Sequence, residues 1–285
     1  MMLRLLATTV IGLSAIAPAT LAQSSPLCLP PALNRFQTHT AQSGDTVSSL
    51  AQRYRLTPQT LRTFNPDLTG NAIAPGRIVK IPPFNGIAVQ VPTGATWQDL
   101  AQAYGVRADI LFELNGCQAP ASLAFIPGNP QNDSDSGRRD TYIGLSLYPL
   151  PQPATIGLAY GWYDATPNAT EQTFHSGMDL LAEPGTTVLA ASPGVVVFVG
   201  SQNAYGTLVI LQHGTERQTR YAHLQDTLVE VGQWVQAGEA IARVGTSGQP
   251  DIPPPHLHFE VRQASPIGWV AQDPEIHLPP DAIAP

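Results

Sequence analysis

The C-terminal half of the chain consists of short runs in which apolar and polar residues alternate. A period of two is typical of strands that bury one face, and turn signals such as Pro193-Gly194 and His213-Gly214 separate the runs. The predicted strands cover residues 187–191, 194–200, 206–212, 218–223, 234–235, 239–244 and 256–262. Many short strands at close spacing predict an all-β sandwich or small barrel.

The N-terminal half contains an internal repeat. Residues 43–54 align with residues 93–104, an offset of 50 positions. In both copies apolar residues recur at the spacing of one helix face, as Val47, Leu50 and Tyr54 do in the first copy. Each copy therefore begins with a predicted amphipathic helix.

Capping residues and extended runs complete the two units. Thr46 and Thr96 stand where they can cap the first helix of each copy, and Thr57-Pro58 marks the start of a second helix. The flanking extended segments are residues 38–42, 73–81, 88–91 and 123–126. We predict two small α+β modules of the order strand, helix, helix, strand, at residues 38–82 and 87–127. The all-β domain follows them.

Three further segments lie outside these units. Residues 1–22 carry Arg4, then an apolar stretch, then small residues, which is the pattern of an export signal peptide. An uncleaved anchor is the alternative, but the stretch is short for a span and none as long follows, so we expect no stable membrane span after signal removal. Residues 128–140 are polar and predict a flexible linker. The β-domain is therefore expected at residues 141–270, with a proline-rich tail at 271–285.

The chain has two cysteines, Cys28 and Cys117. An exported protein meets oxidising conditions, so we expect them to form a disulfide that ties the mature N-terminus to the end of the second repeat. Cys28 follows Leu27 rather than a small residue, which argues against lipid modification. We expect an exported protein, periplasmic or associated with the cell wall.

Charge excludes one class of partner. The formal net charge is −7, charged residues make up 12% of the chain, and Lys80 is the only lysine. Such a chain offers no basic patch to neutralise phosphates, so we expect no nucleic-acid partner.

Five residues of the β-domain can carry metal chemistry. They lie in three strings, His175-Ser-Gly-Met-Asp179, Tyr221-Ala-His223 and His256-Leu-His258. In a strand His256 and His258 would share one face, and the four-residue spacing of His175 and Asp179 is also even. Imidazole and carboxylate are the ligands zinc prefers at catalytic sites, where three protein groups leave a fourth position open. Enough groups are present for three ligands and two further imidazoles that handle protons.

These strings resemble the lysostaphin/LytM-type zinc endopeptidases, which cut peptide cross-links of bacterial cell walls. The family reads HxxxD, then an isolated histidine in a Tyr-x-His-Leu string, then HxH, and the likeness here runs from about residue 160 to 262. The resemblance implies that His175, Asp179 and His258 bind Zn²⁺ and that His223 and His256 form the catalytic pair. It leaves two bonds open, a glycine bridge or a D-alanyl–diaminopimelate link, of which the export signal favours the second.

One segment departs from the family pattern. A glycine-, serine- or threonine-rich turn is usual before HxH, whereas this chain has a longer segment stiffened by proline, residues 246–255. The substrate-binding rim there is not predicted by the resemblance. The other histidines, His39, His213 and His277, are not expected to bind metal.

The two repeats resemble LysM modules, compact βααβ domains that bind glycans containing N-acetylglucosamine. The likeness is carried in the first copy by Ser43-Gly-Asp-Thr46, Tyr54 and Asn65-Pro66, and it is weaker in the second, where Ala95 replaces the usual aspartate. It implies peptidoglycan as partner, with glycan contacts from Ser43, Gly44, Asp45, Thr46, Thr57 and Asn65. A purely structural role for these residues, as caps and turns, is the alternative.

Three functions compete on this evidence. The first is a zinc endopeptidase of peptidoglycan cross-links, held on the wall by its LysM-like modules. The others are a non-catalytic activator of cell-wall amidases and a glycan-binding wall protein. The complete set of five residues favours the first. A lipoyl or biotinyl carrier domain, which the strand pattern also suggests, is excluded because the C-terminal domain has no lysine.

Overall fold

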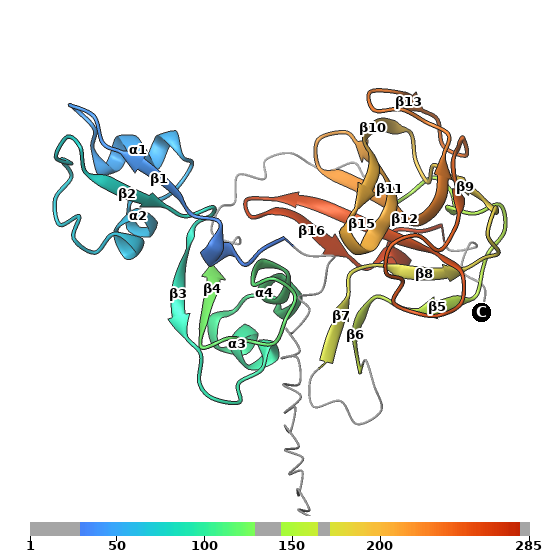
Figure 1. Ribbon diagram of the computed structural model, residues 1–285, viewed down its shortest axis with the longest axis horizontal. Coiled ribbons are helices and arrows are strands. Elements are labelled where there is room, and N and C mark those ends of the chain that lie inside the picture. The colour runs from blue at the N-terminus through green and yellow to red at the C-terminus, as the bar shows by residue number, and fades with distance from the viewer. Residues whose placement is uncertain (1–28, 129–143, 165–171, 280–285) are drawn as a thin grey trace, which may run out of the picture.

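The computed structural model describes residues 29–128, 144–164 and 172–279, which form two small α+β modules and a larger β-domain (Figure 1). The predicted signal peptide, Cys28, nearly all of the predicted linker and the end of the tail lie outside the described residues. No helix among the described residues is long and apolar enough to cross a bilayer.

The first module has the predicted order. Its elements are β1 (Gln37–Thr40), α1 (Val47–Arg53), α2 (Pro58–Phe64) and β2 (Ile78–Ile81). β1 and β2 pair antiparallel. Thr46 caps α1 by accepting a hydrogen bond from the Ser49 amide, and Thr57 caps α2 in the same way ahead of Pro58. The module closes over an apolar core of its own, which includes Val47, Leu50 and Leu61.

The second module repeats this order. A short 3₁₀ turn, Ala32–Asn34, precedes β1 in the chain and packs against the second module. Its elements are β3 (Gly86–Gln90), α3 (Trp97–Tyr104), α4 (Ala108–Leu114) and β4 (Leu123–Pro127), and β3 pairs antiparallel with β4. Thr96 caps α3 reciprocally with Asp99. The repeat read from the sequence is thus confirmed as two βααβ modules.

The β-domain is built on one antiparallel sheet, which holds ten strands within the described residues. They are β5 (Ile156–Leu158), β8 (Met178–Leu181), β9 (Thr187–Leu189), β10 (Gly194–Gln202), β11 (Gly206–His213), β12 (Arg217–Thr227), β13 (Trp234–Val235), β14 (Ala240–Val244), β15 (His256–Ser265) and β16 (Gly268–Gln272). The central order is β10-β11-β12-β15-β8. Every run predicted from alternation forms a strand.

Several short strands were not predicted. They include β5, β8 and β16 of the sheet and the separate hairpin of β6 (Gly161–Asp164) and β7 (Gln172–His175). After β16 comes a 3₁₀ turn, Pro274–Ile276, and Leu278 beyond it packs in the core of the sheet. The β-domain therefore continues past residue 270.

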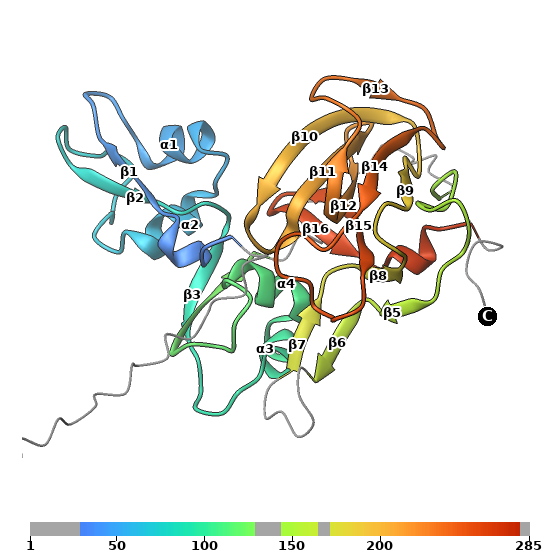
Figure 2. The same cartoon turned by 45° about the vertical axis from the view of Figure 1, so that its right-hand side comes forward.

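The second module shares its apolar core with the β-domain. Phe112 of α4 lies edge-on to Trp162 of β6 and to Phe174 of β7, with ring centroids 5.3 and 6.2 Å apart. Ile267 and Val270 belong to the same buried cluster. Both views place α3 and α4 beside β6 and β7, whereas α1 and α2 stand apart from the sheet (Figure 1, Figure 2). This shared apolar core ties the second module to the β-domain.

Candidate metal and catalytic site

Strand β15 positions the histidines of the site because its two faces carry different residues. Leu257, Phe259 and Val261 point into the core of the sheet and are fully buried. The alternate residues, His256 and His258, therefore share the opposite face, as predicted. The register pairs His258 with Asp179 on β8 and with Ala222 on β12, so three adjacent strands bring the strings together.

His175, Asp179 and His258 meet in one cluster. The His258 Nδ1 lies 2.9 Å from Asp179 Oδ1 and 3.0 Å from His175 Nε2, and His175 Nε2 lies 3.1 Å from Asp179 Oδ1. All three residues are buried. Two imidazoles and a carboxylate converging in this way can hold a metal ion.

The polar atoms around the cluster support a metal. Asp179 Oδ2 and His256 Nε2 are buried and make no hydrogen bond within the described part of the chain. Leaving buried polar atoms unpaired costs about 1–3 kcal/mol each. A bound cation with its ligands would satisfy such atoms, so the residues present fit the metal that the sequence predicts.

The segment from His175 to Asp179 is held by a close backbone approach. His175 ends β7, and its Nδ1 donates a hydrogen bond to the Ala159 carbonyl at 2.9 Å, which leaves Nε2 for the cluster. A Cβ on Gly177 would lie 2.6 Å from the Phe259 carbonyl oxygen and 2.9 Å from the His258 ring. Only glycine therefore lets this segment pass so near β15.

His223 and His256 flank the cluster, with ring centroids 5.1 Å apart. His223 Nδ1 donates to the Ser247 carbonyl and His256 Nδ1 donates to the Pro254 carbonyl, at 2.8 and 2.7 Å. Because a carbonyl only accepts, each ring keeps an unprotonated Nε2 when neutral. His223 also has a left-handed backbone with φ of 58°, a strained conformation of the kind that gathers at functional sites.

Burial and neighbouring charge set the protonation of these groups. Burial would raise the pKa of Asp179, but hydrogen bonds from His175 and His258 hold that pKa well below its ordinary value. Burial lowers the pKa of His223 to about 4, with the charge of His258 acting in the same direction. His223 is therefore neutral near pH 7, so its ring can accept a proton.

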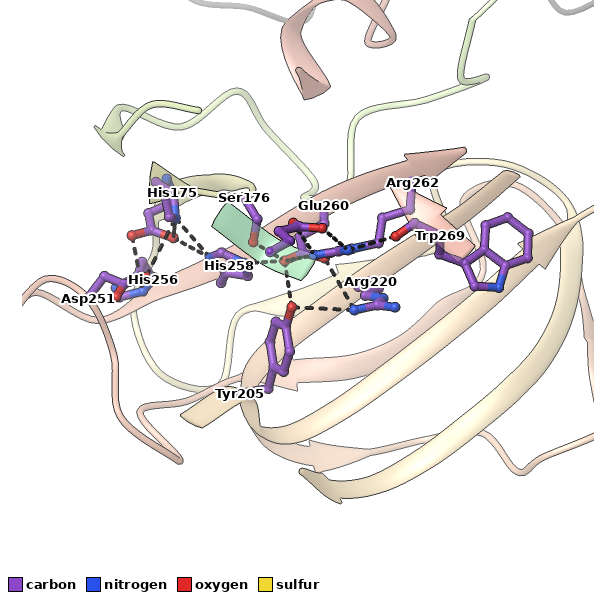
Figure 3. Close-up of polar contacts among 12 residues, drawn as sticks. His175, Ser176, Tyr205, Arg220, Asp251, His256, His258, Glu260, Arg262 and Trp269 are labelled. Atoms are coloured by element: carbon purple, nitrogen blue, oxygen red, sulfur yellow. Dashed lines mark hydrogen bonds and ion pairs between the residues drawn. The ribbon is translucent and has the colours of Figure 1, made fainter. Parts of the chain in front are cut away.

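Sequence reasoning missed Asp251. Its Oδ2 lies 3.7 Å from His175 Nε2, and its carboxylate joins the cluster that can hold a metal. Figure 3 shows Asp251 beside His175 and His256 at one end of the site. The residue stands alone in the proline-stiffened segment before His256, where no period links it to the other strings, so the sequence carried no signal for it.

Sequence reasoning also missed Glu260 and Arg262. They continue the alternation of His256 and His258 along the same face of β15, and both are buried. The period of two could have found them, because four polar side chains at successive alternate positions stand out beside an apolar face.

Four of the residues predicted to bind glycan make hydrogen bonds that stabilise the first module. Asp45 is buried and accepts hydrogen bonds from the Gln42 amide and the His39 ring, at 2.8 and 2.9 Å. Asn65 is buried and bonds the main chain of Leu61 and Lys80. Thr46 and Thr57 are helix caps. Their glycan contacts stay a prediction. The Cys28–Cys117 disulfide does too, since Cys28 lies outside the described residues.

Comparison with known proteins gives the family. Residues 173–274 match Peptidase family M23, and residues 39–82 match the LysM domain. The chain is 38% identical over 220 residues to the uncharacterized lipoprotein YgeR of Escherichia coli K12, an alignment that covers 71% of this chain and 85% of YgeR. The chain belongs to peptidase family M23. It is a metallopeptidase that carries a LysM domain, as the sequence predicted.

Two other matches cover a smaller part of this chain. The peptidoglycan DD-endopeptidase ShyA of Vibrio cholerae is 39% identical over 87 residues, which are 30% of this chain and 20% of ShyA. Among solved structures, the catalytic domain of the antimicrobial peptidase lysostaphin from Staphylococcus simulans is 33% identical, with a TM-score of 0.37. That match covers 42% of this chain and 89% of the lysostaphin domain.

Proposed function

We propose that this M23 peptidase is an exported, zinc-dependent endopeptidase that hydrolyses peptide cross-links of bacterial peptidoglycan. The observation that carries the proposal is the buried meeting of His175, Asp179 and His258, flanked by two further imidazoles. The similarity to the DD-endopeptidase ShyA favours the bond between D-alanine and diaminopimelate as the one cleaved.

In this proposal the metal ligands are His175 through Nε2, Asp179 through its carboxylate and His258 through Nδ1. Two neutral imidazoles and one carboxylate are a zinc-binding set that leaves a coordination position for substrate or water. A bound zinc ion supplies Lewis-acid chemistry, because it polarises a carbonyl oxygen and makes water more acidic.

His223 and His256 act on protons and charge. Hydrolysis adds water across the amide, so a proton must leave the water and a proton must reach the departing amine. In the neutral form each ring keeps a free lone pair on Nε2, since its Nδ1 donates to a carbonyl, and His256 Nε2 lies 3.6 Å from Asp179 Oδ2. One ring accepts the proton and delivers it to the amine. The other ring takes up a proton from solvent at Nε2 and then stabilises the negative charge that develops on the carbonyl oxygen.

The N-terminal modules hold the peptidase on its substrate in this proposal. The LysM domain at residues 39–82 supports binding to the glycan strands of peptidoglycan, where a tethered peptidase meets its peptide substrate at a high effective concentration. Of the residues predicted to contact glycan, Ser43, Gly44 and Thr57 are exposed. The signal-like N-terminus and the named lipoprotein relatives support export to the cell envelope.

The test is digestion of defined cross-linked muropeptides by the full-length zinc-loaded protein, with product masses measured. We expect dimers to become monomers with a new terminal carboxylate on D-alanine and a new amine on diaminopimelate. Retention of every dimer by a protein that holds one zinc ion would contradict the proposal. If that inert protein stimulated a wall amidase, a regulatory function would replace the catalytic one.

A further inference from the structure

The metal-facing histidine of β15 has a second partner. His258 presents Nδ1 to Asp179, and its Nε2 lies 3.2 Å from Glu260 Oε1. Glu260 has no exposed surface. A carboxylate on the far nitrogen of a metal-binding imidazole fixes the tautomer and the orientation of the ring. Glu260 therefore determines how His258 faces the cluster.

Glu260 is itself held by several donors. Ser176 Oγ and Tyr205 OH donate to its Oε1 at 2.5 and 2.7 Å, and Arg262 Nε donates to its Oε2 at 2.6 Å. Figure 3 shows these groups converging on Glu260 behind His258. Three donors besides His258 therefore fix the position of the carboxylate that faces the His258 ring.

Arg262 extends this network into the second module. Its Nη1 and Nη2 donate to Glu113 Oε2 and Oε1, each at 3.2 Å, and Glu113 belongs to α4. The pair is bidentate, a geometry that fixes the plane of a guanidinium. Arg262 is 7% exposed, so water screens the pair little. A carboxylate 145 residues before His258 thus anchors the arginine that holds Glu260.

The charges explain why Glu113 matters to a metal. Arg262 divides its positive charge between two carboxylates. Without the negative charge of Glu113, Arg262 would draw more strongly on Glu260, which would then accept less well from His258. The same loss removes a negative charge from the surroundings of a cation. Both effects weaken metal binding.

We propose that Glu113 is a positioning residue of the metal centre. Through Arg262 and Glu260 it holds His258 in its metal-binding orientation, so that the second module forms part of the outer shell of the site. The inference rests on His258 being a metal ligand, as proposed above.

A matched control lies on the same helix. Asp109 of α4 is a buried carboxylate at the same domain boundary, but its contacts are Arg107 and the hydroxyl of Tyr160, at 3.0 and 3.2 Å. Glu113→Gln and Asp109→Asn each remove one negative charge from α4 and one cross-domain contact. Only the first touches the network behind His258.

The experiment measures zinc affinity of the full-length protein by competition with a chromophoric chelator, and the visible spectrum of the Co²⁺-loaded form. We expect Glu113→Gln to weaken zinc binding about 3- to 10-fold, less than the 10–100-fold typical of groups that contact a ligand directly. Its Co²⁺ bands should shift. Asp109→Asn should stay within about twofold of the wild type, since it leaves that shell intact. Melting of the metal-free proteins reports the structural cost of each change.

The outcomes separate this inference from the proposed function. Equal zinc affinity in the two variants would overturn the role of Glu113 while leaving the peptidase proposal in place. A wild-type chain that binds no zinc would overturn both. Should Glu113→Gln not fold, Arg262→Lys keeps the charge but loses the bidentate pair, and unchanged affinity and Co²⁺ bands in that variant would overturn the inference equally.

Discussion

His258 and Asp179 lie directly opposite each other on β15 and β8, with Nδ1 and Oδ1 2.9 Å apart. The chain forms most strands of the sheet between these two residues. The site therefore exists only when the central strands are in register. Because side chains alternate, a slip of one residue would put Phe259 in the place of His258 and move both histidines into the core.

We expect His258→Ala to lose the metal. The change removes one of the three proposed ligands, and zinc content of the purified protein should fall from about one equivalent to near zero. Metal analysis after dialysis against a weak chelator provides the measurement. A fully loaded His258→Ala protein would show that the ligands lie elsewhere.

His223→Ala should separate chemistry from metal binding. His223 flanks the cluster but is not a proposed ligand, so zinc content should remain near that of the wild type. The loss of a proton-handling imidazole should slow cleavage of cross-linked muropeptides by about 10²- to 10⁴-fold. The His256→Ala variant should behave alike. If either variant loses zinc instead, the division between ligands and catalytic pair is wrong.

Asp251 should contribute less to metal binding than Asp179. Its side chain is 22% exposed, whereas that of Asp179 is fully buried, and it lies on a loop rather than a strand. We expect Asp251→Ala to lower zinc affinity by less than about tenfold and Asp179→Ala to abolish binding, because water can replace an exposed oxygen ligand but not a buried one. Chelator competition compares the two. Equal losses would make Asp251 a full ligand.

Gly177→Ala should disturb both stability and the site. The added Cβ would lie 2.6 Å from a backbone oxygen of β15, and relieving that contact costs about 1–3 kcal/mol of unfolding free energy. Denaturant titration measures it. Gly70→Ala is the control, because a Cβ there meets no atom within 4 Å. A Gly177→Ala protein as stable as the Gly70 variant would contradict the close approach.

Asp45 should make the LysM domain sensitive to acid. A hydrogen bond from the Gln42 amide lowers the pKa of Asp45 below its ordinary value of 3.8, and the His39 side chain acts in the same direction. A carboxyl whose pKa is lower in the folded state stabilises the fold at pH values above its unfolded-state pKa. That stabilisation is lost as the pH falls through the folded-state pKa. The difference in melting temperature between wild type and Asp45→Asn should therefore be largest at neutral pH and shrink below about pH 4. A constant difference would contradict this.

The sequence predicted the parts of the fold and site that depend on local period. Alternation placed His256 and His258 on one face of a strand, and helical spacing with capping threonines predicted α1 to α3. The sequence pattern could not predict β5 to β8, because these strands have only three or four residues, too few to show a clear alternation.

Contacts between segments far apart in the chain could not be predicted either, because a local period does not tell which segments pack together. Glu113 reads in sequence as one charged residue of an amphipathic helix, and only docking of α4 against β15 and β16 gives it Arg262 as partner. Asp251 likewise has no periodic neighbour. Its place beside His175 depends on how a proline-rich loop folds back over the strand.

The two N-terminal modules differ in how they are joined to the rest of the chain. The first encloses its own apolar cluster, and the second shares one with Phe174 and Val270. A chimaera in which the first module is exchanged for an unrelated wall-binding domain should keep a working peptidase. Exchange of the second would expose the apolar side chains of the β-domain that it covers, so the peptidase depends on the second module for its fold.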